Sequence, residues 1–110
     1  HMPYKDSVQG LREIYRVTSR TAVISVPDAT RVARIEFPIP KYGKVRKLLT
    51  LPKCRPLALE LSEDGHHWEL GKKDYPASRF IQDIQEVGFS LENEYRVFEN
   101  PYHHFFILNK

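Results

Sequence analysis

Hydrophobic and polar residues alternate along much of this chain, most clearly between Leu57 and Leu70. The apolar positions are every second residue on either side of a Glu-Asp-Gly interruption: Leu57, Leu59, Leu61, Trp68 and Leu70. Because alternate residues of a strand lie on one face, this stretch predicts a β-hairpin with one apolar face. We expect Trp68 to be buried against Leu59 and Leu61, and the remaining chain to supply partners for that face.

Shorter alternating stretches predict further strands at residues 11–17, 21–26, 31–37, 44–51, 94–98 and 103–108. In the third of these, Ala33, Ile35 and Phe37 are predicted to face the core. Residues 38–43 contain two prolines, which lack the N–H that a central strand needs, so this segment is predicted as a loop. Asn100-Pro101 predicts a turn. Residues 3–10 show no clear period and are predicted to lead into the fold without regular structure.

Residues 72–88 fit two patterns. Phe80, Ile84 and Gly88 alternate with polar residues as in a strand, yet Phe80, Ile81, Ile84 and Val87 also lie at helical spacing. Pro76 near the start and Gly88 in the position of a C-terminal cap favour the helix. We therefore predict one short helix near residues 76–87.

Roughly eight strands at spacings of about 8 to 12 residues predict an all-β fold, an antiparallel β-sandwich resembling a jelly roll. The helix near residues 76–87 leaves a small α+β domain as the alternative. A chain of 110 residues, 41% of them hydrophobic, is expected to form one β-rich domain over residues 11–110. Residues 1–10 are interpreted as a tag remnant, His1-Met2, and a lead-in segment. The longest apolar run, Phe105–Leu108, is too short to cross a bilayer.

Charge is unevenly distributed although the net charge is only +3. Residues 1–56 hold twelve Lys and Arg against four Asp and Glu, whereas residues 57–110 hold five against ten. This asymmetry predicts a two-sided electrostatic surface unless folding interleaves the two halves.

The sequence offers little for catalysis. Cys54 is the only cysteine, so no intrachain disulfide forms, and an intracellular, cytoplasmic compartment is favoured with an extracellular one left open. A catalytic cysteine also needs a positioned histidine. The histidine pairs 66–67 and 103–104, with Glu69, lack the spacing of a zinc site. We predict no enzyme activity, no cofactor and no metal, and a pocket where a histidine and a carboxylate converge would reopen the question.

A basic run is the most suggestive functional feature. No acidic residue lies between Glu36 and Glu60, and Tyr42 stands among the cations as a candidate interface anchor. The predicted binding residues are Lys41, Tyr42, Lys44, Arg46, Lys47, Lys53 and Arg55.

A family resemblance concerns residues 31–70. The order RVARIEFPIP, KVRKLLTL and PLALELSEDGHHWEL resembles the central part of discoidin domains, the F5/8 type C or galactose-binding-like jelly rolls. The matching hairpin residues are Ser62, Asp64, Gly65 and Trp68, while the arginine-rich ending and the terminal cysteine pair of that family are absent. The resemblance implies a jelly-roll sandwich that binds glycans, phospholipid or protein through loops, without catalysis.

Three functions follow as hypotheses. The first is a noncatalytic protein–protein interaction or assembly module, a scaffold within a larger protein, whose basic patch meets a partner that carries acidic groups. The second is a carbohydrate-binding module that uses Tyr42, Tyr75 and Tyr102 as exposed aromatics. The third is binding of nucleic acid or another acidic surface through the basic run.

Overall fold

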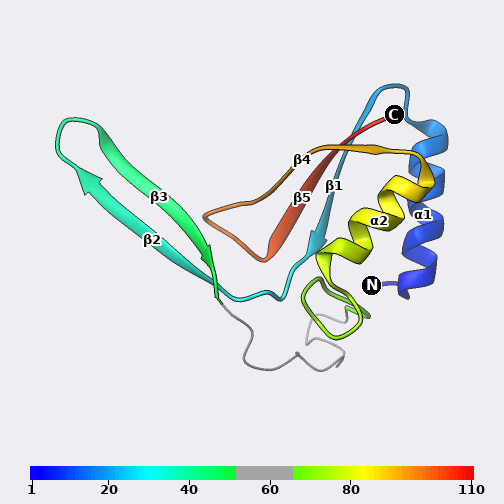
Figure 1. Cartoon of the computed structure of the whole chain (residues 1–110), viewed down its shortest axis with the longest axis horizontal. Helices are drawn as coiled ribbons and strands as arrows, with labels where there is room; N and C mark the ends of the chain where they lie inside the picture. Colours follow the sequence, from blue (N-terminus) through cyan, green and yellow to red (C-terminus); the bar gives the residue numbers. More distant parts are fainter. Residues whose placement is uncertain (52–65) are drawn as a thin grey trace.

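The computed structural model describes residues 1–51 and 66–110, which form two helices and antiparallel strands (Figure 1). The elements are α1 (Tyr4–Val17), β1 (Thr21–Pro27), β2 (Val32–Ile39), β3 (Gly43–Thr50), α2 (Ala77–Val87), β4 (Ser90–Arg96) and β5 (His103–Asn109). A small mixed α+β domain, the alternative from the sequence, therefore fits. The predicted β-sandwich is not confirmed.

The body of the molecule is a three-stranded sheet of order β1-β5-β4 with helices on one face. Phe106 and Leu108 of β5 are fully buried on that face, and Ile24 of β1 packs beside them. The opposite face carries the alternate residues, of which Val23 is 61% exposed. Strands β1 and β5 confirm the predicted strands at 21–26 and 103–108. The strand predicted at 94–98 is confirmed only in part, because β4 begins at Ser90 and ends at Arg96. A turn at residues 101–102 lies between β4 and β5.

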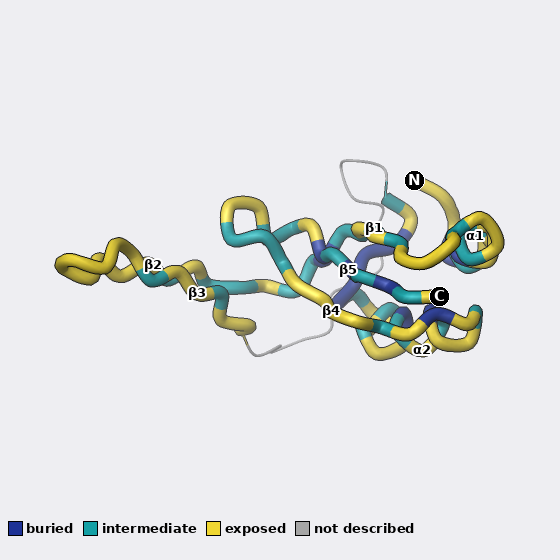
Figure 2. Tube along the Cα trace, turned by 90° about the horizontal axis from the view of Figure 1, so that it is seen from above, coloured by how far each residue is buried: buried dark blue, intermediate teal, exposed yellow. Residues whose placement is uncertain are grey.

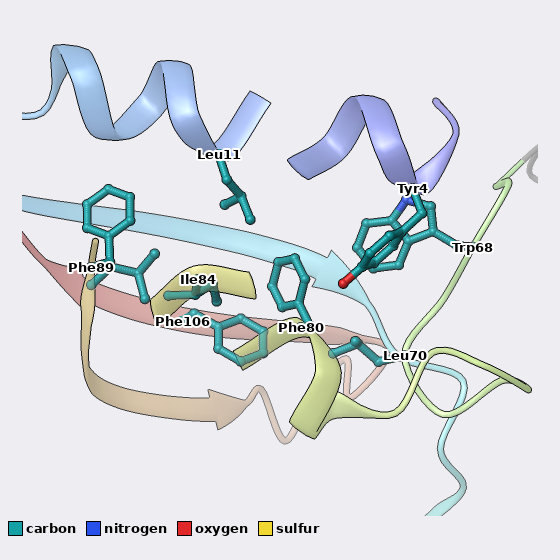
Figure 3. Close-up of a cluster of buried hydrophobic side chains, with 9 residues drawn as sticks. Tyr4, Leu11, Trp68, Leu70, Phe80, Ile84, Phe89 and Phe106 are labelled. Atoms are coloured by element: carbon teal, nitrogen blue, oxygen red, sulfur yellow. The ribbon is translucent and has the colours of Figure 1, made fainter. Parts of the chain in front are cut away.

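Aromatic side chains fill the core between the helices and the sheet (Figure 3). Trp68 is 7% exposed and meets Tyr4 edge-on, with ring centroids 4.9 Å apart. Its indole N–H donates to the Ser7 hydroxyl at 3.0 Å, and Phe80 lies 5.5 Å from its ring. The predicted burial of Trp68 is confirmed, while its expected partners Leu59 and Leu61 lie outside the described residues.

The N-terminal part of the chain differs from the prediction. Residues 4–17 form helix α1 instead of a lead-in segment followed by a strand. Tyr4, Val8, Leu11 and Tyr15 recur at three- and four-residue intervals and all pack on the core. Glu13 falls on the same parity as Leu11 and Tyr15, so the alternation that predicted a strand is broken there. The apolar residues of this segment therefore have helical spacing, which agrees with the observed helix.

Strands β2 and β3 form a separate hairpin that extends away from the body (Figure 1). The molecule is consequently elongated, with principal extents of 49 × 35 × 21 Å. Both strands were predicted, but β2 continues through Pro38 and Ile39, which were predicted as loop, so that only residues 40–42 form the turn. A two-stranded hairpin has an unpaired edge on each strand, and a proline is tolerated there.

The second half of the predicted central hairpin is not a strand in the described part of the chain. Residues 66–70 have only a parallel bridge between Leu70 and Asp28, and Trp68, Glu69 and Leu70 are all buried rather than alternating. Residues 57–65 of that hairpin, with Ser62, Asp64 and Gly65, lie outside the described residues. The predicted helix near 76–87 is confirmed as α2, and Gly88 caps it at φ 122°.

Candidate functional site

The register of the projecting hairpin separates its side chains into two faces. Val32, Arg34, Glu36 and Pro38 pair with Thr50, Leu48, Arg46 and Lys44, which makes one face largely polar. The intervening pairs form the other face, which is largely apolar, and we call it the apolar hairpin face: Ala33, Ile35, Phe37, Ile39, Val45, Lys47 and Leu49. Residues that face each other across a hairpin share one side of it, so both faces follow directly from the alternation in the sequence.

The apolar hairpin face is exposed. Phe37 is 58% exposed, Leu49 47% and Ile39 39%. Ala33, Ile35 and Phe37 were predicted to face the core, and this is wrong for Phe37, because the hairpin stands away from the body (Figure 2). The alternation correctly identifies which residues share a face but not what covers that face.

The polar hairpin face neutralises part of the predicted basic patch. Glu36 lies 3.4 Å from the Lys44 ammonium and 3.5 Å from the Arg46 guanidinium. Arg46 also reaches Glu99 at 2.7 Å in the loop before β5, and its guanidinium lies 5.4 Å from the ring of Phe98. Lys44 and Arg46 thus hold acidic neighbours, which lowers the charge that they offer to a partner, and Arg46 also joins the hairpin to the loop before β5.

The other described members of the predicted patch lie at the tip and on the apolar face. Tyr42 is 86% exposed in the turn, beside Lys41, whose φ of 76° is rare for a side-chain-bearing residue. Lys47 stands opposite Ile35 on the apolar hairpin face. Among the described residues, Lys41 and Lys47 have no ion-pair partner. Lys53 and Arg55 lie outside the described residues, as does Cys54.

A cavity of about 440 Å³ lies where the hairpin meets the body. Its lining includes Leu48 and Arg46 of β3 and Glu94, Arg96 and His104 of the sheet. The His104 Nδ1 lies 2.8 Å from an Asp28 carboxylate oxygen, and its Nε2 lies 3.4 Å from Glu94. A histidine and carboxylates therefore do converge at a pocket, the arrangement that the sequence alone did not predict.

The same cluster also holds neighbouring parts of the fold together. The Arg96 guanidinium donates to the backbone carbonyls of Thr30 at 2.9 Å and Asp28 at 3.2 Å, which ties β4 to the turn after β1. Burial alone would raise the pKa of Asp28, but hydrogen bonds from His104 and Thr30 and the charge of Arg96 hold it below its usual value. Each nitrogen of the His104 ring thus lies against a carboxylate, Asp28 at Nδ1 and Glu94 at Nε2.

A second polar cluster involves Tyr102, whose hydroxyl donates to Glu69 at 2.6 Å, with His66 Nδ1 2.8 Å from that hydroxyl. Burial opposes the charge of Glu69, yet the Tyr102 hydrogen bond and Lys72 at 3.4 Å lower its pKa. Tyr102 and Tyr75 are both half-buried, so Tyr42 alone of the three predicted exposed aromatics is fully exposed. Across residues 1–51 and 66–110, no group of three or more metal-ligating side chains is placed to hold an ion.

Sequence reasoning missed one surface. On the face of the sheet that carries no helix, Val23, Tyr95, Phe105 and Ile107 lie together, and we call this the outer sheet face. The rings of Tyr95 and Phe105 stack with centroids 5.4 Å apart. The run from Phe105 to Leu108 could have indicated this surface. All four residues are apolar, so β5 has hydrophobic side chains on both faces of the sheet.

Comparison of this chain with protein-family models, with curated proteins and with solved structures gives no match. The resemblance to discoidin domains thus stays a prediction. Neither helix in the described ranges is long and apolar enough to cross a membrane.

Proposed function

We propose that this chain is a noncatalytic protein-interaction module whose docking surface is the apolar hairpin face. The partner is a protein that presents an apolar sheet face with acidic side chains at its margin. The observation that carries the proposal is the exposure of Phe37, Leu49 and Ile39 on a hairpin that projects from the body.

Exposed hydrophobic groups gathered on one face support docking better than isolated ones do. Single exposed apolar residues are ordinary on soluble proteins, whereas contiguous patches mark interaction surfaces. Here Phe37 and Ile39 are neighbours on one face of β2, and Leu49 lies on the same face of β3, with the half-buried Ile35 and Val45 between them. Covering them with a partner removes apolar area from water, which is the main favourable contribution to most protein association.

The charges around this face favour an acidic margin on the partner. Lys47 lies within the face and Lys41 at the tip, and both ammonium groups are without an ion-pair partner in the described part of the chain. Complementary charge speeds association and fixes the orientation of docking.

The alternatives receive less support. Nucleic-acid binding calls for cations gathered on one surface, but Lys44 and Arg46 lie on the polar face beside Glu36, opposite to Lys47. Glycan binding rested on the discoidin-like hairpin and on three exposed tyrosines. Of these, Tyr75 packs against Tyr4 with centroids 5.0 Å apart, and Tyr102 is hydrogen-bonded to Glu69.

The test is co-precipitation from cells of the natural source with the tagged chain, Phe37→Asp and Val17→Asp. Val17 is the matched control because it is 68% exposed at the end of α1, far from the hairpin. We expect proteins identified by mass spectrometry that bind the wild type and Val17→Asp but are lost with Phe37→Asp. A folded Phe37→Asp variant that retains every partner of the wild type would contradict the proposal.

A further inference from the structure

Two apolar surfaces of this chain lack a cover, the apolar hairpin face and the outer sheet face. On the outer sheet face Val23 is 61% exposed and Tyr95 44%, although both sit beside hydrophobic neighbours in the register. Figure 1 shows the hairpin extending away from the sheet, so within one chain the two surfaces do not meet.

The two surfaces match in size. Strands β2 and β3 have 8 residues each, and strands β1, β4 and β5 have 7 each. At about 3.3 Å per residue each surface is roughly 23 to 26 Å long. Sheets that pack face to face interdigitate apolar side chains over such lengths, and the layers lie about 10 Å apart.

The two surfaces also match in charge. The hairpin from β2 to β3 contains five basic residues and one acidic residue: Arg34, Lys41, Lys44, Arg46, Lys47 and Glu36. Strand β4, at the edge of the sheet, instead carries the exposed Glu92, which accepts a hydrogen bond at 2.9 Å from Asn109 on the outer parity of β5. Glu94 pairs with Phe106 and belongs to the opposite face. A hairpin laid on the outer sheet face would bring Lys47, on its contact surface, toward Glu92 at the sheet edge.

We infer that the partner of the apolar hairpin face is a second copy of this chain, which receives the hairpin on its outer sheet face. The inference rests on the proposed function and names its partner. In a two-fold dimer each copy gives its hairpin to the other, so both uncovered surfaces of both chains are buried. The two-stranded and three-stranded sheets then form a sandwich whose layers come from different chains.

The test measures the association of the full chain by sedimentation velocity over a concentration series. We expect a dimer for the wild type, and a dissociation constant raised at least about 30-fold by Phe37→Asp on the hairpin and by Val23→Lys on the sheet. Val17→Asp, on α1, leaves the dimer unchanged. Where circular dichroism shows that either variant fails to fold, Ile39→Asp and Tyr95→Lys repeat the test on the same two surfaces.

Mixing the two variants provides a sharper readout than either alone. Phe37→Asp keeps an intact sheet face, and Val23→Lys keeps an intact hairpin, so a mixed pair recovers one of the two contacts. We expect a tagged Phe37→Asp chain to capture untagged Val23→Lys more strongly than either variant captures itself. Simple loss of folding would not produce this recovery.

The failures of the two proposals are distinguishable. A wild-type chain that stays monomeric at hundreds of micromolar overturns the second copy as partner, while a Phe37-dependent partner in the co-precipitation would still support the proposed function. A dimer abolished by Phe37→Asp but not by Val23→Lys overturns the sheet as receptor. Assemblies that grow without limit overturn the closed two-fold arrangement, as does a mixture that recovers nothing.

Discussion

Strands β1 and β2 have almost the same pattern of alternating residues but lie in different environments. In β1, Ala22, Ile24 and Val26 pack against the core beneath the helices. In β2, the alternate residue Phe37 is 58% exposed, although it is larger than any of those three. Figure 2 shows the same contrast, with buried residues confined to the body and none along the hairpin.

The difference shows that alternation predicts which residues share a face of a strand, but not whether another element covers that face. A residue's parity is fixed by the strand alone, whereas its burial depends on which elements stand opposite it. Helices α1 and α2 provide the cover for β1, but no described helix lies over β2 and β3. An apolar face without an internal cover is what an interaction module needs.

The largest expected effect on stability comes from truncating one phenylalanine in the body and comparing it with one in the hairpin. Phe106 is fully buried, so Phe106→Ala should lower the free energy of unfolding by about 3 to 5 kcal/mol. Phe37→Ala should change it by less than about 0.5 kcal/mol, because the side chain already meets water. Urea denaturation followed by circular dichroism measures both.

The protein concentration in that experiment must be low enough for the chain to be monomeric, since self-association adds stability by mass action. A loss above about 1 kcal/mol for Phe37→Ala in the monomer would show that the hairpin contributes to the core. Equal losses for the two variants would remove the distinction between body and hairpin.

A smaller effect concerns the Asp28–His104–Arg96 cluster, which ties β4 to the turn after β1. Asp28→Asn weakens the hydrogen bond from His104 and should cost about 1 to 3 kcal/mol near pH 7. The pKa of Asp28 is lowered in the folded chain, so its stabilising contribution is present above the unfolded pKa of about 3.9 and is lost as pH falls through the lower folded pKa.

The stability difference between wild type and Asp28→Asn should therefore shrink from pH 7 to pH 2.5, as measured by urea denaturation at each pH. Glu69, whose pKa is also lowered, makes both proteins less stable in acid, which is why the difference rather than either absolute value is compared. A difference that is constant over this range would show that the carboxylate charge of Asp28 contributes nothing.

The sequence predicted the strands that carry one clear period, and also the helix whose two possible periods were decided by Pro76 and Gly88. The strands at 21–26 and 31–37 and the helix with its cap at Gly88 are all present. Residues 4–17 were mistaken because Leu11, Tyr15 and Val17 share parity by coincidence, while Val17 is in fact 68% exposed. Long-range placement was beyond reach, since nothing local shows that Asp28, Arg96 and His104 meet.

The candidate site was predicted only in part, because long-range contacts are not visible in the local sequence. Tyr42 and Lys47 were selected from composition and do lie on exposed parts of the hairpin. The pairing of Arg46 with Glu99 could not be predicted, because it joins residues 53 positions apart in the sequence. That contact lies between the hairpin and the body, and it is the subject of the smallest expected effect.

Arg46→Ala should alter the free energy of unfolding by less than about 1 kcal/mol, because both partners are exposed, 48% and 65%, and such ion pairs are weak. We expect the substitution to change instead the orientation of the hairpin relative to the body. In the wild type, residual dipolar couplings from β2–β3 and from β1-β5-β4 should fit one alignment tensor, whereas Arg46→Ala should require two. Lys41→Ala, at the tip, is the control and should keep a single tensor.

A single tensor for Arg46→Ala would contradict this role of Arg46. The Arg34 guanidinium, which donates to the Glu99 carbonyl at 3.3 Å, would then be sufficient to fix the hairpin, and a variant with both Arg34→Ala and Arg46→Ala should release it.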